Sequence, residues 1–104
     1  MADVNNIVIT GTIFDNPKFY SIKGSTLTVV YFTLACNRGA KKLDPGYMFN
    51  VTATLKKTEL SSISRGARVC VTGYIRNSTD DGIEKTVIHS QEIISLPIDR
   101  EVYP

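Results

Sequence analysis

Residues 27–38, LTVVYFTLACNR, decide the fold class of this chain. Apolar residues occupy both parities at the start of this stretch, and Phe32 and Leu34 then alternate with more polar neighbours. The alternation predicts a β-strand with one face in a core. The strand leads into the basic segment RGAKK at residues 38–42. Most loop lysines are simply solvated, but a strand that ends in cations also suits a small β-barrel that meets a phosphate backbone.

Charge is distributed unevenly along the chain. The formal net charge is only +2. Residues 1–17 carry a net charge of −2, residues 18–76 a net charge of +8, and residues 77–104 a net charge of −4. If the middle segment folds onto one side, it forms a positive stripe. The distribution favours a surface for a polyanion about as strongly as it favours an ordinary solvated face.

Length and composition bound the class of protein. A chain of 104 residues forms one domain, here expected over 1–104 with a core at about 5–96 and a short extension at 97–104. No apolar run approaches the roughly 18 residues of a membrane span, and the start MADVNN is unlike a secretory signal. We therefore expect a cytoplasmic protein in which Cys36 and Cys70 are reduced packing residues.

The hydrophobic pattern predicts five strands and one helix. Gly11 interrupts the first strand and indicates a bend, and Asp81-Gly82 indicates a hairpin turn before the last strand, which we expect to be irregular near Ser90-Gln91. The expected strands are residues 4–14, 27–37, 47–56, 67–77 and 84–96.

The single expected helix lies between the third and fourth strands. Thr58 can cap it, Leu60 and Ile63 have i,i+3 spacing, and Gly66 can end it. This order predicts an all-β, five-stranded OB-fold barrel whose short helix covers one open end. An SH3-like barrel lacks that helix, and a sandwich of this length would have more strands.

Short motifs in a fixed order carry a family resemblance. They are NNIVITGTI at residues 5–13, Asn16-Pro17, Phe32-Thr33-Leu34-Ala35 with Asn37-Arg38, residues 49–57, Leu60 in the helix, Arg65-Gly66 and Val71-Thr72-Gly73. Together they resemble the bacterial single-stranded DNA-binding protein family over nearly the whole chain. Residues 86–91, TVIHSQ, also resemble the last strand of a relative with the same fold, primosomal replication protein B.

The resemblance implies an OB-fold that binds single-stranded DNA without catalysis and with little sequence preference, in replication, recombination or repair. It also implies a homodimer or homotetramer in a bacterial cytoplasm. The resemblance does not distinguish a chromosomal gene from a plasmid or phage gene. The apolar run at Ile7, Val8 and Ile9 independently suggests that the first strand lies at an interface. An acidic C-terminal tail recruits replication partners in such proteins, and this chain ends in DREVYP instead.

The chain has no Trp, although the family grips bases with several aromatic residues. The resemblance aligns two residues of the third strand with base-stacking aromatic positions of the family. One of them, Phe49, is still aromatic, and the other is Leu55. The alternation of the third strand sends both residues to the core, whereas the resemblance places them on the DNA face. For Phe49 we slightly favour an orientation toward DNA over one toward the core. For Leu55 both orientations stay open, and a Leu55→Trp variant can distinguish them.

The candidate site therefore combines flat or apolar groups for bases with cations for phosphates. Each tyrosine among them could equally be a packing residue, and Phe14, Phe19 and Phe32 are assigned to the core. The candidates for bases are Tyr31, Tyr47, Phe49, Leu55 and Tyr74, and those for phosphates are Arg38, Lys41, Lys42, Lys56, Lys57, Arg76 and Lys85.

No catalytic or metal-binding pattern is visible. His89 is the single histidine and has no neighbour with ligand spacing, and the two cysteines form no Cys-x-x-Cys pair. We expect no enzyme activity and no cofactor. The alternative function is an OB-fold adaptor of a primosome-like assembly that acts mainly through protein contacts. The missing Trp favours the adaptor, and the +8 middle segment favours DNA.

Overall fold

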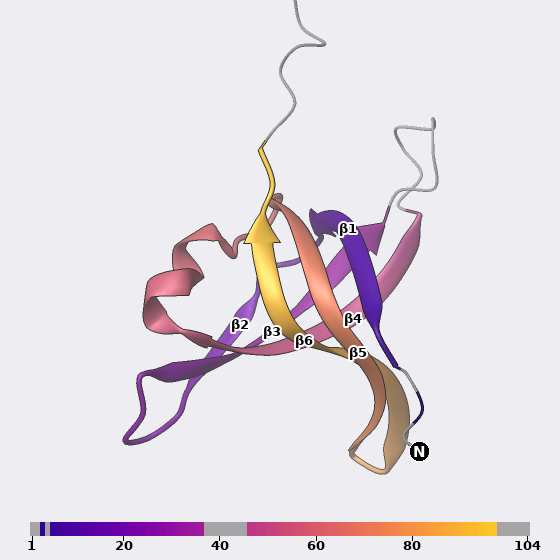
Figure 1. The fold of residues 1–104 in the computed structure, drawn as a ribbon. Coiled ribbons are helices and arrows are strands. Elements are labelled where there is room, and N and C mark those ends of the chain that lie inside the picture. The colour runs from indigo at the N-terminus through magenta and orange to yellow at the C-terminus, as the bar shows by residue number, and fades with distance from the viewer. Residues whose placement is uncertain (1–2, 4, 37–45, 98–104) are drawn as a thin grey trace, which may run out of the picture.

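The computed structural model describes residues 3, 5–36 and 46–97. Within these ranges six strands and one short 3-10 helix follow each other along the chain (Figure 1). They are β1 (Ile7–Ile13), β2 (Lys18–Ser21), β3 (Leu27–Cys36), β4 (Tyr47–Lys56), η1 (Lys57–Ser62), β5 (Arg68–Asp80) and β6 (Ile83–Ser95).

The strands form one sheet that curls back on itself. Its order is β1-β5-β6-β4-β3-β2, and a further pairing of β1 with β3 partly closes the ring. The closing pairs are Thr12 opposite Ala35 and Ile13 opposite Leu34. With η1 between β4 and β5, this is the expected five-stranded OB-fold barrel plus one additional edge strand, β2. The fold prediction is confirmed.

Gly11 lies where the barrel closes. A Cβ atom on Gly11 would stand 2.6 Å from the carbonyl oxygen of Ala35 and 3.0 Å from the Leu34 side chain. The missing side chain therefore lets β1 approach β3 closely, which is the physical reason for a glycine at this position, whereas the pairing of β1 with β5 continues through Gly11 without a bulge.

Alternating side chains of β3 and β4 fill the core. On β3, Val30 and Leu34 are fully buried and Phe32 is 4% exposed. From β5, Val69 and Val71 join them. Burying one such side chain contributes on the order of 1.5–3 kcal/mol, so this alternation supplies much of the driving force for folding.

The helix occurs where it was expected, but its cap differs. Lys56 occupies the N-cap position instead of Thr58, and the backbone N–H of Lys56 donates a 3.0 Å hydrogen bond to Glu59 Oε1. Leu60 packs against the core, and Ile63 just after the helix is buried within it. The segment thus covers the barrel as expected.

The sequence missed β2 and misplaced two phenylalanines. All four residues of β2 are exposed, because this short strand pairs with β3 on one side and forms an edge of the sheet. Phe19 on β2 is 45% exposed and Phe14, just past β1, is 52% exposed. Their assignment to the core was therefore wrong, whereas that of Phe32 is confirmed.

The β5–β6 hairpin turns at Asp81 and Gly82, whose positive φ angles of 51° and 77° fit the expected tight turn. Further along, Thr72 pairs with Glu92 but Gly73 pairs with Ser90, so Gln91 is an extra residue in a bulge. This is the irregularity expected near that position. The bulge reverses which parity of β6 faces outward.

Candidate nucleic-acid interface

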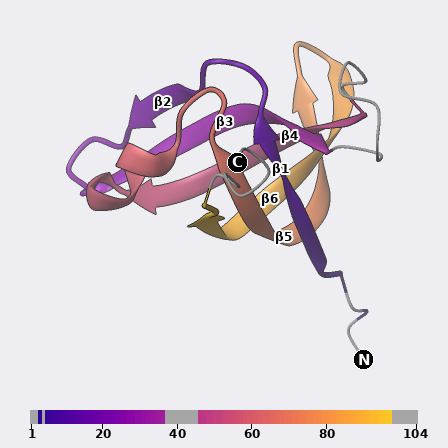
Figure 2. The same cartoon turned by 90° about the horizontal axis from the view of Figure 1, so that it is seen from above.

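A groove of about 690 Å³ lies on the outer face of the curled sheet. Its floor comes from β3 and β4, and its walls come from β2 on one side and the β5–β6 hairpin on the other. Figures 1 and 2 show β2 and the hairpin standing apart with β3 and β4 between them. The lining residues are Asp15, Lys18, Tyr20, Val29, Tyr31, Phe32, Thr33, Asn50, Val51, Thr52, Arg76, Ser78, Thr79, Lys85 and Val87.

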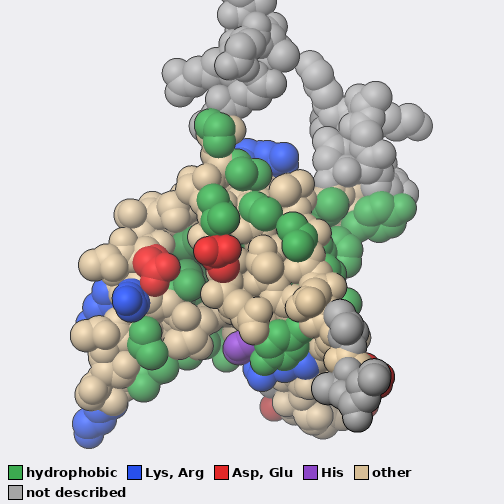
Figure 3. All heavy atoms as spheres, viewed as in Figure 1, with side chains coloured by type: hydrophobic (Ala, Val, Ile, Leu, Met, Phe, Trp, Pro, Cys, Tyr) green, Lys and Arg blue, Asp and Glu red, His purple; other side chains and the backbone are tan. Residues whose placement is uncertain are grey.

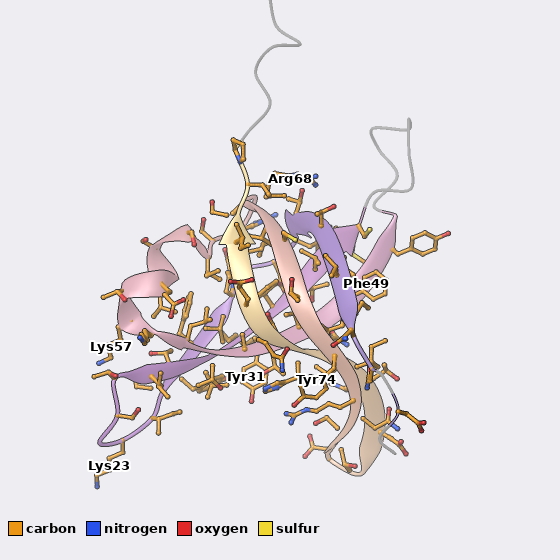
Figure 4. All side chains as sticks on the ribbon, in the orientation of Figure 1. Lys23, Tyr31, Phe49, Lys57, Arg68 and Tyr74 are labelled. Carbon is orange, nitrogen blue, oxygen red and sulfur yellow. The ribbon has the colours of Figure 1, made fainter. Side chains whose placement is uncertain are left out.

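One register row crosses five strands on this face. It contains Tyr74 on β5, His89 on β6, Thr52 on β4, Tyr31 on β3 and Lys18 on β2. Neighbouring strands lie about 4.8 Å apart, so Tyr74 and Tyr31 are separated by roughly 14 Å of sheet. Figure 4 shows both tyrosines on the same side of the sheet. The row places flat side chains and a cation along one line.

Two ring contacts lie along the groove. The centroids of Tyr20 and Tyr31 are 5.6 Å apart with an interplanar angle of 77°, and those of Tyr74 and His89 are 5.2 Å apart at 40°. Tyr20 and Tyr31 are about half exposed, with exposed fractions of 54% and 46%. These rings therefore offer open faces to which a base could bind.

Three cations and one carboxylate line the groove, namely Lys18, Arg76, Lys85 and Asp15. Asp15 accepts two hydrogen bonds from Thr33, at 2.9 Å from the backbone N–H and at 3.0 Å from the hydroxyl. These bonds hold the carboxylate against β3. Among the described lining residues the positive charges therefore outnumber the negative one, and the Asp15 carboxylate has a structural role.

Four sequence-predicted residues meet at this groove or its margin: Tyr31, Tyr74, Arg76 and Lys85. The sequence missed Lys18 and Tyr20 because β2 was not predicted. Lys18 and Tyr20 have the i,i+2 spacing of residues on one face of a strand, and this was the one pattern in the sequence that pointed to β2. Four residues are too few to identify a strand from such spacing.

Leu55 lies in the core, not on the interface. It is 6% exposed and belongs to the buried cluster. The β3–β4 register runs without interruption from Leu27 opposite Lys56 to Cys36 opposite Tyr47, so no bulge turns Leu55 outward. The alternation in the sequence was correct, and the placement of Leu55 by resemblance was wrong.

Phe49 also lies on the core side of β4. It is partly buried, packs against the core cluster and lines a separate hollow of about 260 Å³ with Met48, Ile75 and Ile88. The continuous register with β3 again fixes its direction. The slight preference for a DNA-facing Phe49 is therefore corrected, because this side chain does not share the face of Tyr31.

The remaining candidates lie elsewhere. Tyr47 is 56% exposed at the start of β4, outside the groove lining. Lys56 and Lys57 are exposed at the end of β4 and in η1, and Figure 4 shows Lys57 at the end of the sheet away from Phe49. Arg38, Lys41 and Lys42 lie outside the described residues, so their predicted phosphate contacts stay predictions.

His89 has an unusual environment. Its Nδ1 atom is buried and has no hydrogen-bond partner among the described residues. Burial, and secondarily repulsion by the Arg76 guanidinium, hold the pKa of His89 below its ordinary value. The described ranges contain no cluster of three metal-ligating side chains. They also contain no helix that is long and apolar enough to cross a membrane.

Solved structures of a PriB domain and of single-stranded DNA-binding proteins share this fold. No family model and no curated protein matches the chain. The N-terminal domain of PriB from Thermoanaerobacter tencongensis, a dimer, aligns with a TM-score of 0.69 at 19% identity, over 90% of this chain and 98% of that one. The match confirms the OB-fold.

Two single-stranded DNA-binding proteins also align. The Plasmodium falciparum protein, solved in complex with single-stranded DNA, gives a TM-score of 0.71 at 19% identity over 93% of this chain and 98% of that one. A deletion mutant of the Thermus aquaticus protein gives 0.73 at 19% identity, over 97% of this chain and 45% of that one. The structural neighbours are thus the two groups of proteins that the sequence motifs resemble.

Proposed function

We propose that this chain is a non-catalytic, sequence-tolerant single-stranded DNA-binding protein that acts in replication, recombination or repair. The observation that carries the proposal is the groove, which combines the open rings of Tyr20 and Tyr31 with the cations Lys18, Arg76 and Lys85. Stacking of a base on an aromatic ring contributes about 1–3 kcal/mol, and cations bind the phosphates. The structural neighbours that bind single-stranded DNA support the same function.

The groove suits unpaired bases better than a duplex. An aromatic ring can stack only on a base whose face is free, and bases inside a duplex stack on one another. Among the described residues of the lining, Asn50 is the single one with an amide side chain, so hydrogen-bond reading of base edges is limited. We therefore expect affinity for single strands with little dependence on base composition.

A competition assay tests this function. A fluorescent dT oligonucleotide is bound to the protein at fixed salt, and unlabelled single-stranded and duplex DNA of the same length compete for it. We expect the single strand to displace the probe at far lower concentration, and mixed-sequence single strands to compete nearly as well as dT. Equal competition by the duplex would refute the proposal.

We further propose a homodimer or homotetramer assembled through β1. Among the described strands, β5 pairs along β1 whereas β3 reaches only Thr12 and Ile13, which leaves one edge of residues 7–11 open. Val8, on the outer face of β1, is 67% exposed. Figure 3 shows hydrophobic side chains gathered on the face formed by β1, β5 and β6. An open edge beside an apolar face favours association.

Light scattering of two matched variants tests the assembly. Val8→Asp should reduce the mass at micromolar concentration, because a charge would be placed in the interface. Ile83→Asp is the control, since Ile83 is similarly exposed, at 61%, but lies at the hairpin tip. A monomeric wild-type protein, or a loss of mass in Ile83→Asp alone, would contradict the proposal.

The apolar face also supports an adaptor of a primosome-like assembly as the second candidate function. Val8 and Ile94 are exposed on this face, and one structural neighbour is a PriB domain. An adaptor would bind its protein partner through this face and would show weak, salt-insensitive binding of DNA. That result in titrations with the dT oligonucleotide at several salt concentrations would favour the adaptor over the DNA-binding function.

A further inference from the structure

His89 lies in the middle of the groove-face row, between Tyr74 on β5 and Thr52 on β4. It is the single histidine of the chain. The bulge at Gln91 fixes its direction, because residues of β6 before the bulge face outward when their numbers are odd. His89 therefore shares a face with Val87 and Lys85, which line the groove.

The surroundings of this ring in the free protein disfavour its protonated form. Nδ1 is buried without a hydrogen-bond partner among the described residues, and one ring face packs near Tyr74. An added proton would place a second N–H donor or a positive charge in a site that offers neither an acceptor for Nδ1 nor full hydration. Burial and the nearby Arg76 thus lower the pKa of His89.

The charges around His89 on its face are mostly positive. From β5 the facing groups are Tyr74 and Arg76, and β4 contributes the uncharged Thr52 with Asn50 and Thr54 on either side. The further titratable groups on this face or in the groove lining, among the described residues, are Tyr31 on β3, Lys18 and Tyr20 on β2, Asp15 between β1 and β2, Lys56 at the end of β4, and Lys85 and Glu92 on β6. Glu92 lies beyond the bulge, opposite Thr72.

A phosphate in the groove would reverse this balance. It would not remove the burial that is the larger cause of the lowered pKa of His89, but it would compensate the charge of Arg76, the smaller cause, and would add an attractive negative charge of its own. The protonated imidazole would then be favoured in the complex more than in the free protein.

We propose that His89 takes up a proton when a phosphate of single-stranded DNA enters the groove, so that binding strengthens as the pH falls. The inference rests on the proposed DNA-binding function. Because the bound state then holds more protons than the free state, the association constant rises toward acid, and one proton limits the change to about tenfold per pH unit.

Titrations with a dT oligonucleotide test the coupling, because neither thymine nor the phosphodiester titrates near neutral pH. At constant ionic strength, the wild-type protein should bind severalfold to about tenfold more tightly at about pH 5.5 than at about pH 7.5. His89→Gln should bind with little dependence on pH, and His89→Lys should bind at both pH values about as tightly as the acidic wild type. The same change of Kd with pH in the wild type and in His89→Gln would overturn the inference.

The single histidine also permits a test that needs no variant. The NMR resonance of its Cε1–H gives the pKa of His89 directly, without and with saturating dT oligonucleotide. A higher pKa in the complex supports the inference, and an unchanged or lower one overturns it. Failure to bind dT at either pH would overturn the proposed function itself, whereas tight binding that does not depend on pH would overturn only the role of His89.

Discussion

Replacing Tyr31 by Ala should weaken DNA binding with a modest loss of stability. The ring lies in the groove, is 46% exposed, and touches Tyr20 edge-on at 5.6 Å. Losing one base-stacking platform costs about 1–3 kcal/mol of binding free energy, which is roughly a 5- to 150-fold weaker Kd. Losing the edge-on contact with Tyr20 costs about 0.5–1.5 kcal/mol of folding free energy.

Fluorescence anisotropy with a labelled dT oligonucleotide at several salt concentrations measures the effect. The salt slope should be unchanged, because the substitution removes no cation. Tyr47→Ala is the matched control, since Tyr47 is similarly exposed, at 56%, but lies outside the groove lining. An unchanged Kd for Tyr31→Ala, or an equal loss for Tyr47→Ala, would refute the assignment of the groove. Urea denaturation of each variant separates a loss of binding from a loss of folding.

Three further predictions concern individual residues. Leu55→Trp should overpack the core and cost roughly 1–3 kcal/mol of stability, seen as a lower Tm, with no quenching of the new indole by DNA; quenching would place Leu55 on the interface after all. Joint replacement of Lys41 and Lys42 by Ala should weaken binding to all sequences about equally and flatten the salt slope; an unchanged slope would show that both are merely solvated. Free wild-type protein should lose stability as the pH falls below the ordinary histidine value of about 6.5, because the lowered pKa of His89 means that the unfolded chain binds the proton more readily; urea melts of His89→Gln at the same pH values should lack that component, and an identical pH dependence in the variant would contradict it.

Hydrophobic alternation predicted most of the barrel because its strands are long and bury one face. β3 and β4 each span ten residues, and their buried parity is the one that the sequence indicates. The hairpin turn at Asp81 was also predictable, because two consecutive residues with positive φ favour Asp-Gly.

Short edge elements could not be predicted in the same way. β2 has four residues, all exposed, so it shows no burial pattern, and its partner β3 determines its position. Tyr20 and Lys18 were missed with it. Phe14 and Phe19 look like core residues by type alone, but they lie beside and on this edge, where no second layer covers them.

At the candidate site, the family resemblance and the hydrophobic periodicity gave conflicting predictions for Phe49 and Leu55. Periodicity was right for Phe49 and Leu55, because the uninterrupted pairing of β3 with β4 leaves no room for a change of parity. The buried Nδ1 of His89, which has no hydrogen-bond partner among the described residues, could not be predicted at all, since its burial depends on how the sheet brings β4 and β5 to either side of β6.

The salt dependence of single-stranded DNA binding tests the central assignment most directly. Each phosphate neutralised lowers log K by about 0.7 per unit of log salt, so the three groove cations Lys18, Arg76 and Lys85 predict a slope of about −2 or steeper. Lys18→Ala, Arg76→Ala and Lys85→Ala should each make the slope shallower by about 0.7. Submillimolar binding to dT with a slope near zero, or slopes that these three substitutions leave unchanged, would contradict a DNA-binding groove between β2 and the β5–β6 hairpin.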